Sequence, residues 1–492
     1  MTPKISQGLL LISLFIVSFL SLVGGVGLRA IVESYKAPIV TTNITAAEVV
    51  KTEPPVAAPR PLFSSFLDSS KILFDEDENA FLNFKKQLIN NNVKFVEIDL
   101  RKMQMFLYEG GQVIKEIPVL SKGRDGSWWE TPTGKYSILT KEANHFSSIG
   151  KVWMPWSMQF YGNFFIHGWP YYPDGSPVTK AFSGGCVRLS TEDAKVVFDF
   201  IDKGTPVLVL DEPDNFAEPN ISLTEKVAAN LQPPLISAKA ALITDLDSGL
   251  ILLNKNADEV LPIASLTKLQ TAVVASELIN LERSVKASPL AFTKKIPQSI
   301  VESRLLSPLF AGISLIIGKS YTAFDLLYPL LMQSSNEAAS TISSFLGREE
   351  FVKQMNNKAE SLGMANTTFT DTSGKDNGNI STAKDLAKLS KYILEKRNFL
   401  FNITKGEQYL IFGPGNFGGL QNYNEFANQV NLIGVKNGET TAAKQTMSTV
   451  WQLHNNDGSL NQRFAVIVLG SEDRRADTEK LVSWLGDNFG LH

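Results

Sequence analysis

Cysteine is almost absent from this chain. Cys186 is the only cysteine among 492 residues, so no internal disulfide can form. Histidine is scarce as well: there are four, and no run of histidines, cysteines and carboxylates has the spacing of metal ligands. The sequence therefore excludes a disulfide-stapled fold, and it gives no indication of a metal ion or another cofactor.

The chain also lacks an excess of positive charge. It carries 47 lysines and arginines against 50 aspartates and glutamates, for a formal net charge of −3. Without a basic field, nucleic acid is not an expected partner. Hydrophobic residues at 43% and charged residues at 20% are typical of a folded protein, and the length is too great for one hydrophobic core. We therefore expect two or three domains.

One long apolar run is present, at residues 8–28. It has no charge and is about as long as a helix needs to cross a bilayer. Because Lys4 and the amino terminus precede it, it predicts a single-pass membrane anchor with a cytoplasmic amino terminus and the other domains outside, on the periplasmic or cell-wall side. A cleaved signal peptide is the competing interpretation, for which "GGVGLRA" supplies only a loose cleavage site.

The middle of the chain changes pattern twice. Residues 36–75 are rich in Thr, Ala and Pro without any period, which predicts a flexible tether. Residues 75–92 have acids at the front and an apolar face, which indicates an amphipathic helix. From residue 93, short alternating segments between Gly and Pro predict a mostly β domain, with a hairpin that turns at Gly110-Gly111.

The last part predicts an α/β layered domain, because strands near both ends flank segments with helical apolar spacing. The expected organisation is multidomain: tip and transmembrane anchor 1–35, tether 36–75, mostly β domain 76–212 with its core at 93–212, linker 213–235, and α/β domain 236–492.

The single cysteine lies in a setting that suits a nucleophile. "FFIHGW" ends an apolar strand at His167, and Cys186 follows 19 residues later in the glycine-rich "AFSGGCVRLS". Two strand ends can place the imidazole against the thiol and lower the pKa of the thiol by pairing thiolate with imidazolium. The alternative is a small buried hydrophobic residue, but an unpaired thiol in an oxidising compartment is a chemical liability.

These residues resemble the catalytic motif of the L,D-transpeptidases (the YkuD-type domain), over about 93–212. The resemblance implies a β-sandwich-like fold with Cys186 as nucleophile and His167 as base. It also implies that the Gly168 carbonyl orients the imidazole and that Arg188 braces the loop. The implied substrate and oxyanion residues of this domain are Gly168, Ser183, Gly184, Gly185 and Arg188, with Gly184 standing where the family often has a second histidine.

A second nucleophile is indicated by "PIASLTKLQ", where Ser265 and Lys268 are three residues apart at the start of a helix. That spacing places both on one face, so the amine can accept the hydroxyl proton if its pKa is lowered. Ser-x-x-Lys alone is a weak signal. Here "QSSNEAA" and "GVKNGET" follow in the order Ser-x-Asn and Lys-x-Gly.

The three motifs resemble those of penicillin-binding proteins and β-lactamases, and more narrowly the D-alanyl-D-alanine carboxypeptidases, over about 236–492. The resemblance implies that Ser265 is acylated, that Lys268 is its base and that Ser334 relays protons. It assigns an oxyanion hole to the amides of Ser265 and Glu439. The implied substrate and oxyanion residues are Asn336 on the peptide amide, Lys436 with Thr440 on the terminal carboxylate, and Asn437, Gly438 and Glu439. Asn437 replaces the family's Thr, and Lys444 stands where Gly is usual.

Together the motifs predict a bifunctional peptidoglycan-remodelling enzyme. The serine domain would trim terminal D-Ala from pentapeptide stems, and the cysteine domain would use the tetrapeptide as acyl donor for 3→3 cross-links. The expected partners are stem peptides, with β-lactams as covalent inhibitors. Two alternatives remain open: a catalytically weak or inactive wall-binding or β-lactam-sensing protein, and a cysteine domain that hydrolyses or attaches proteins to the wall.

Overall fold

The computed structural model describes residues 73, 75–211, 223–224, 227, 231–287, 315–316, 318–407, 417, 420–455 and 461–492. All elements below lie in one compact unit, Ser65–His492. The anchor predicted at 8–28 and most of the tether and linker fall outside the described residues, so the anchor and the domain boundaries stay predictions. Within the described ranges, no helix has the length and apolarity that crossing a bilayer would require.

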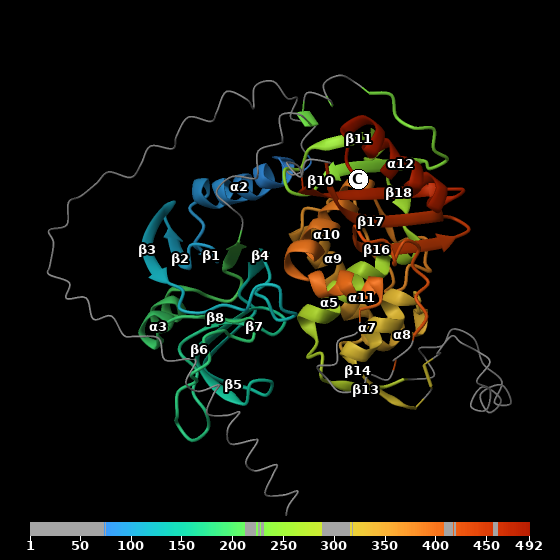
Figure 1. The fold of residues 1–492 in the computed structure, drawn as a ribbon. Coiled ribbons are helices and arrows are strands. Elements are labelled where there is room, and N and C mark those ends of the chain that lie inside the picture. Colours follow the sequence, from blue (N-terminus) through green and yellow to red (C-terminus); the bar gives the residue numbers. More distant parts are fainter. Residues whose placement is uncertain are drawn as a thin grey trace, which may run out of the picture. The chain divides into compact units, whose positions relative to one another are not determined.

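The first part of the chain forms two β-sheets (Figure 1), with strand orders β3-β2-β1-β9-β4 and β5-β6-β7-β8. The strands are β1 Phe95–Asp99, β2 Gln104–Glu109, β3 Gln112–Pro118, β4 Gly134–Ser137, β5 Thr140–Ser147, β6 Val152–Tyr161, β7 Phe164–His167, β8 Val187–Arg188 and β9 Pro206–Leu210. The predicted hairpin is confirmed, since β2 and β3 pair antiparallel across Gly110 and Gly111. The helix predicted over 75–92 is α2, Asp75–Asn90.

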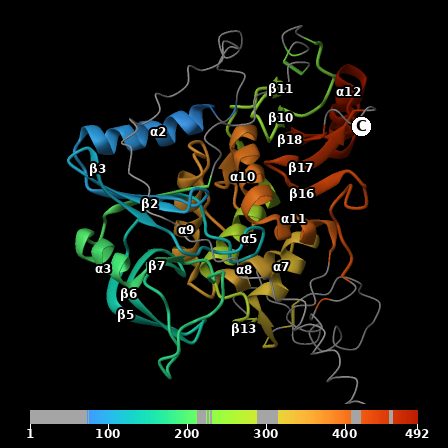
Figure 2. The same cartoon turned by 60° about the vertical axis from the view of Figure 1, so that its left-hand side comes forward.

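Apolar residues from both sheets share one core, to which β1 contributes Val96 and Ile98 and β6 contributes Met158 and Phe160. Helix α3 (Thr191–Phe200) packs beside β6 and adds buried residues to that core (Figure 2). The sequence reading missed α3. Serine is a preferred residue at the start of a helix, so Ser190 is a sequence signal for this one. In the structure its hydroxyl caps the helix by accepting from the Asp193 amide at 2.9 Å.

The second part is built on an antiparallel sheet of order β11-β10-β18-β17-β16. The strands are β10 Ala240–Asp245, β11 Ile251–Lys255, β16 Leu432–Thr440, β17 Lys444–His454 and β18 Asn461–Ser471, with short pairs β12 Leu261–Pro262 with β15 Ile380–Ser381 and β13 Ser284–Lys286 with β14 Ser320–Thr322. Among the described residues, its helices include the 3₁₀ turn η3 Ala264–Leu266, α5 Thr267–Leu278, α7 Ala323–Met332, α8 Asn336–Ser343, α9 Arg348–Ser361, α10 Ala383–Lys396, α11 Asn398–Lys405 and α12 Arg474–Phe489.

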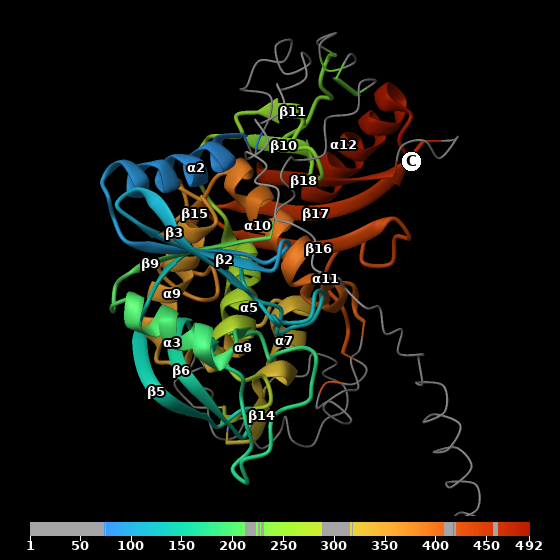
Figure 3. The ribbon, with the colours of Figure 1, turned by 90° about the vertical axis from the view of Figure 1, so that its left-hand side faces the viewer.

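Helices cover both faces of this sheet (Figure 3). Along β18, Val466 and Val468 enter the core formed with α12, whereas Ala465 and Ile467 enter the core formed with α5, α7 and α10. Because successive side chains of a strand point to opposite faces of the sheet, β18 contributes to two cores, and both of its faces must be apolar. This confirms the predicted α/β layered architecture.

Candidate active sites

The fold brings Cys186 and His167 to neighbouring strands. β7 ends at His167, β8 begins one residue after Cys186, and the two strands pair in parallel with Ile166 opposite Val187. His167 Nδ1 lies 2.6 Å from the Gly168 carbonyl oxygen, the contact expected for Gly168. Because a carbonyl only accepts, Nδ1 carries the proton, and Nε2 is left as the hydrogen-bond acceptor.

The thiol itself is buried. Cys186 packs with Val152, Met154 and Val178, and its Sγ lies 3.8 Å from the Asn163 carbonyl oxygen. Burial raises the pKa of the Cys186 thiol to about 11, and burial lowers the pKa of His167 to about 4. Both groups are therefore neutral at pH 7. The predicted thiolate–imidazolium pair is wrong for this state, because burial disfavours both charges.

The residues before Cys186 form a tight turn. The Ser183 hydroxyl donates to the Cys186 carbonyl at 2.5 Å and accepts from the Gly185 amide at 3.0 Å. The Gly185 amide is thus used within the loop and is not a free oxyanion donor here. The Arg188 guanidinium donates to the Lys180 carbonyl at 3.0 Å, so it holds the segment that precedes the turn.

Two adjacent glycines in this turn differ sharply in their surroundings. Gly185 has φ +105°, and a Cβ built on it would lie 2.4 Å from the Phe164 ring and 2.7 Å from the Trp129 carbonyl oxygen. A Cβ on Gly184 would meet nothing within 4 Å.

We therefore expect Gly185→Ala to lower the free energy of unfolding by about 1–3 kcal/mol. Gly184→Ala is the matched control and should change stability by less than about 0.5 kcal/mol. Urea unfolding of both variants checks this. Equal losses would show that the turn tolerates a side chain.

Three groups of the serine site contact one amine, the Nζ of Lys268. Lys268 Nζ lies 2.9 Å from Ser265 Oγ and 2.9 Å from Asn336 Oδ1, and it donates to the Ser373 carbonyl at 2.5 Å. Ser265 lies in η3, Lys268 in the first turn of α5, and Asn336 begins α8. Two of the three predicted motifs thus meet at Lys268.

The surroundings of this amine favour its neutral form. Burial lowers the pKa of Lys268 to about 7, although Asp371 and Glu337 act in the opposite direction. Lys436, from the third motif, is fully buried. Burial and the positive charges of Lys268 and Arg474 hold the pKa of Lys436 well below its usual value. The ammonium of Lys268 is thus one of the charges that act on Lys436.

Ser334 shows two marks of a functional position. Its backbone is left-handed, with φ +58°, and its hydroxyl is buried with no hydrogen-bond partner among the described residues. Backbone strain and an unmet hydroxyl in the turn between α7 and α8 are unfavourable unless a ligand uses them. The hydroxyl is therefore open to a ligand, and the proton-relay role of Ser334 stays a prediction.

The third motif lies on β16, as predicted. A Cβ on Gly438 would lie 2.7 Å from the Ser265 amide nitrogen, so glycine is needed where β16 passes η3. Asn437, the departure from the family pattern, donates to the Tyr423 carbonyl at 3.0 Å. The Thr440 hydroxyl accepts from the Ala443 amide at 3.1 Å, so it caps the β16–β17 turn.

The sequence reading missed two contributors. The Ser373 carbonyl accepts a hydrogen bond from Lys268. Every residue has a main-chain carbonyl, so no residue type in the sequence marks this contact. Arg474, at the start of α12, reaches the Gly438 carbonyl at 3.3 Å and the Glu439 carboxylate at 3.2 Å.

Lys444 has φ +52°, the conformation that the family's usual glycine adopts freely.

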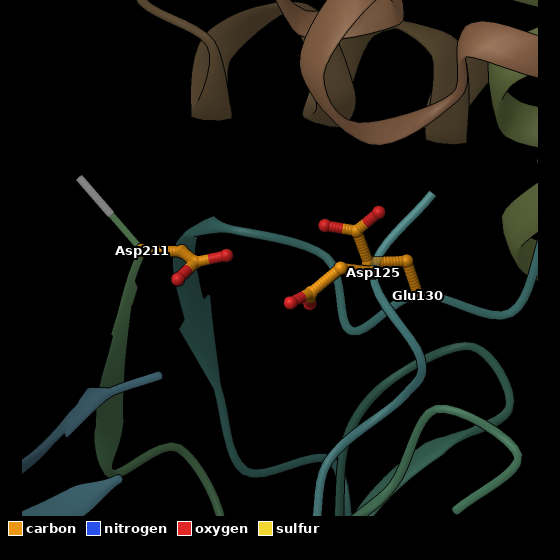
Figure 4. Close-up of side chains that lie close together, drawn as sticks. All are labelled: Asp125, Glu130 and Asp211. Atoms are coloured by element: carbon orange, nitrogen blue, oxygen red, sulfur yellow. The ribbon is translucent and has the colours of Figure 1, made fainter. Parts of the chain in front are cut away.

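Among the described residues, the carboxylates of Asp125, Glu130 and Asp211 lie within 4.8 Å of one another (Figure 4). Two lysines already pair with all three of them. Lys122 pairs with Asp125 at 2.8 Å and Asp211 at 3.5 Å, and Lys396 pairs with Glu130 at 3.0 Å and also with Asp211. The two ammonium groups explain this acidic cluster, and it carries no metal assignment.

Comparison with known families supports both resemblances. Residues 227–470 match the family model described as D-alanyl-D-alanine carboxypeptidase, and residues 93–209 match the model described as L,D-transpeptidase catalytic domain. The resemblance stated from the motifs is thus confirmed for both regions. Together the two matches support a role in peptidoglycan remodelling.

Individual relatives cover parts of the chain. A D-alanyl-D-alanine endopeptidase of Pseudomonas aeruginosa is 33% identical over 180 residues, which are 34% of this chain and 54% of that protein. The D-alanyl-D-alanine carboxypeptidase DacF of Bacillus subtilis is 28% identical over 263 residues, 52% of this chain and 64% of that protein. A solved D-alanyl-D-alanine carboxypeptidase from Mycobacterium tuberculosis aligns at 26% identity and a TM-score of 0.43, covering 52% of this chain and 92% of that one. The chain thus spans a little over half the length of these curated relatives.

Proposed function

We propose that this chain trims and then cross-links peptidoglycan stem peptides, using Ser265 for the first step and Cys186 for the second. The observation that carries the proposal is the triple contact of Lys268 Nζ with Ser265, Asn336 and Ser373. A half-neutral amine within hydrogen-bond distance of a hydroxyl is the arrangement that activates a serine.

In the serine step, Lys268 takes the Ser265 proton as Oγ attacks the carbonyl of the penultimate D-Ala. The bond to the terminal D-Ala breaks, and its nitrogen leaves with a proton. Water then hydrolyses the seryl ester and releases a tetrapeptide. The same acylation chemistry supports covalent inhibition by β-lactams, whose strained amide would acylate Ser265 without ready hydrolysis.

In the cysteine step, the Cys186 thiol attacks the carbonyl of the third stem residue, and its proton passes to Nε2 of His167. The Gly168 carbonyl supports this direction of transfer, because it holds the other nitrogen protonated. The fourth residue leaves as free D-Ala and takes the proton. An amine of a neighbouring stem then displaces the thiolate from the thioester, which forms the 3→3 cross-link.

The two steps gain from sharing one chain. The product of the serine step is the donor of the cysteine step, so linking them raises the local donor concentration. We further propose that the apolar run at 8–28 anchors the chain in the cell membrane, with both sites on the outer side near the wall.

The test is a time course with a purified pentapeptide muropeptide and the full-length chain, followed by mass spectrometry. We expect tetrapeptide first and cross-linked dimer later. Ser265→Ala should stop the first product, and Cys186→Ala should stop only the second. Tetrapeptide supplied to Ser265→Ala should still give dimer.

Other outcomes favour the other candidates. Persistent pentapeptide with cross-linking of supplied tetrapeptide would show an inactive serine site, which the tie between Asn437 and the Tyr423 carbonyl would explain. Tripeptide without dimer would show that the cysteine site hydrolyses. No change in either stem would favour wall binding or β-lactam sensing.

A further inference from the structure

One loop of the cysteine domain lies between its nucleophile and the serine domain. We call it the bracing loop, Lys122–Thr131. On one side it pairs with the turn before Cys186: the Ser183 amide donates to the Lys122 carbonyl at 3.0 Å, and the Thr131 hydroxyl donates to the Gly185 carbonyl at 2.9 Å. These contacts fix both ends of the glycine turn that presents Cys186.

The other side of the bracing loop is held by the serine domain. The Trp128 ring packs against the core that contains α5 and α7, with its centroid 6.2 Å from the Phe324 ring. The buried guanidinium of Arg397 donates to the Glu130 carbonyl at 3.1 Å, and Lys396 pairs with the Glu130 carboxylate at 3.0 Å. An aromatic contact, a hydrogen bond from a side chain to a main-chain carbonyl, and an ion pair thus join one short loop to the second domain.

Asn163 makes a second, independent contact between the two domains, next to the Cys186 thiol. The turn between β6 and β7 places the Asn163 carbonyl 3.8 Å from Cys186 Sγ, and the Asn163 side chain donates to the Leu278 carbonyl, at the end of α5, at 3.0 Å. A Cβ on Gly162 would lie 2.4 Å from Leu278 Cδ2, so the approach is close.

Beneath these contacts lies a buried charge cluster. Glu277, the residue before Leu278, binds Lys358 at 3.2 Å and Arg397 at 3.0 Å, and all three side chains are fully buried. The cysteine domain supplies aromatic faces to it, because the Lys358 ammonium lies 5.5 Å from the Tyr161 ring centroid and 6.0 Å from that of Tyr136. Without those rings the Lys358 ammonium would lose two cation–π contacts, so the buried charge cluster contributes to the contact between the domains.

We propose that the serine domain completes the cysteine site, with Trp128 and Arg397 as positioning residues that hold the Cys186 turn through the bracing loop. The inference rests on the proposed function in assigning a reaction to Cys186. Loss of the contact between the domains is expected to loosen the turn that carries Cys186 and to leave the chemistry of Ser265 in place.

The test compares Trp128→Ala, Trp128→Phe and Phe198→Ala in the full-length chain. Phe198 is the matched control, because it is a half-buried aromatic of the same domain that packs on Trp156 instead of on the serine domain. The rate of alkylation of Cys186 by iodoacetamide at pH 7.5 measures how accessible the thiol in this turn is, since the chain has no other thiol. Cross-linking of supplied tetrapeptide gives kcat and KM.

For Trp128→Ala we expect alkylation at least about tenfold faster and kcat about 10- to 100-fold lower, with KM within about twofold. A misplaced nucleophile lowers the rate of the step, whereas exposure speeds a small reagent. Trp128→Phe should restore most of both properties, and Phe198→Ala should leave both near the parent values. Circular dichroism and a cooperative thermal transition establish that each variant is folded.

Trp128→Ala and Phe198→Ala behaving alike in both assays would overturn the proposal, as would a Trp128→Ala variant unchanged in both. A parent protein that cross-links nothing would instead contradict the proposed function. The alkylation comparison would still decide whether the serine domain holds the turn. If Trp128→Ala does not fold, Arg397→Lys, which keeps the buried charge but reaches fewer partners, takes its place with the same expectations.

Discussion

Replacing Lys268 with arginine is expected to abolish release of terminal D-Ala, with a loss of about 10²- to 10⁴-fold. Arginine keeps a positive charge and hydrogen-bond donors next to Ser265 and Asn336. It cannot give up its proton at any accessible pH, so it cannot accept the proton of the Ser265 hydroxyl. The substitution therefore separates the role of a base from that of a fixed charge.

The same amine sets the pH dependence of the serine site. Burial lowers the pKa of Lys268 from its ordinary value of 10.5 to about 7. The base must be neutral to act, and the neutral fraction rises as the pH increases through the pKa. We therefore expect kcat/KM for D-Ala release to rise from pH 5.5 to 8.5 with a midpoint near 7.

Assay of D-Ala release across this range, for the parent and for Lys268→Arg and Lys268→Ala, checks both statements. Lys195→Ala is a suitable control, because that exposed lysine pairs with Asp199 on the surface helix α3. An active Lys268→Arg variant would show that charge alone suffices. A flat profile between pH 5.5 and 8.5 would show that another group removes the proton.

The parts of this site that could be read from the sequence are those with local spacing. Ser265 and Lys268 are three residues apart on one helical turn, so their contact follows from helix geometry. The strand that carries Gly438 was also readable from its pattern. In each case a short-range period determines which side chains share a face.

The remaining parts depend on long-range packing. The Ser373 carbonyl reaches Lys268 across 105 residues of sequence, and nothing in its side chain signals that contact. The pKa of Lys268 depends on complete burial, which is a property of several packed helices. Trp128 reads as an ordinary loop aromatic, and only the structure shows its ring against Phe324 of the other domain.

The cysteine site shows where local reasoning gave a wrong answer. The motif pattern predicts that His167 and Cys186 lie close together, and the parallel pairing of β7 with β8 is compatible with that prediction. The same reasoning predicted an ion pair, because it could not weigh burial. Val152, Met154 and Val178 enclose the thiol, and an apolar enclosure favours neutral partners over charged ones.

Alkylation of Cys186 in the free protein is therefore expected to be slow at pH 7 and to rise steeply above pH 9. With a pKa of about 11, about one thiol in ten thousand is ionised at pH 7, against roughly 3% for an ordinary cysteine of pKa 8.5. The rate should thus be a few hundredfold below that of free cysteine. Cys186→Ser supplies the blank and should also reduce cross-linking to background.

His167→Gln makes this prediction discriminating. In the free protein His167 is neutral at pH 7, because burial lowers its pKa to about 4, so the substitution should leave the alkylation profile nearly unchanged. Cross-linking should nevertheless fall by about 10²- to 10⁴-fold, because glutamine cannot accept the thiol proton when the donor binds. An alkylation plateau between pH 5 and 8 that His167→Gln removes would instead establish a preformed thiolate–imidazolium pair. The expected result places activation at the moment of substrate binding, when the stem displaces the apolar contacts of Cys186 and brings the carbonyl that receives its sulfur.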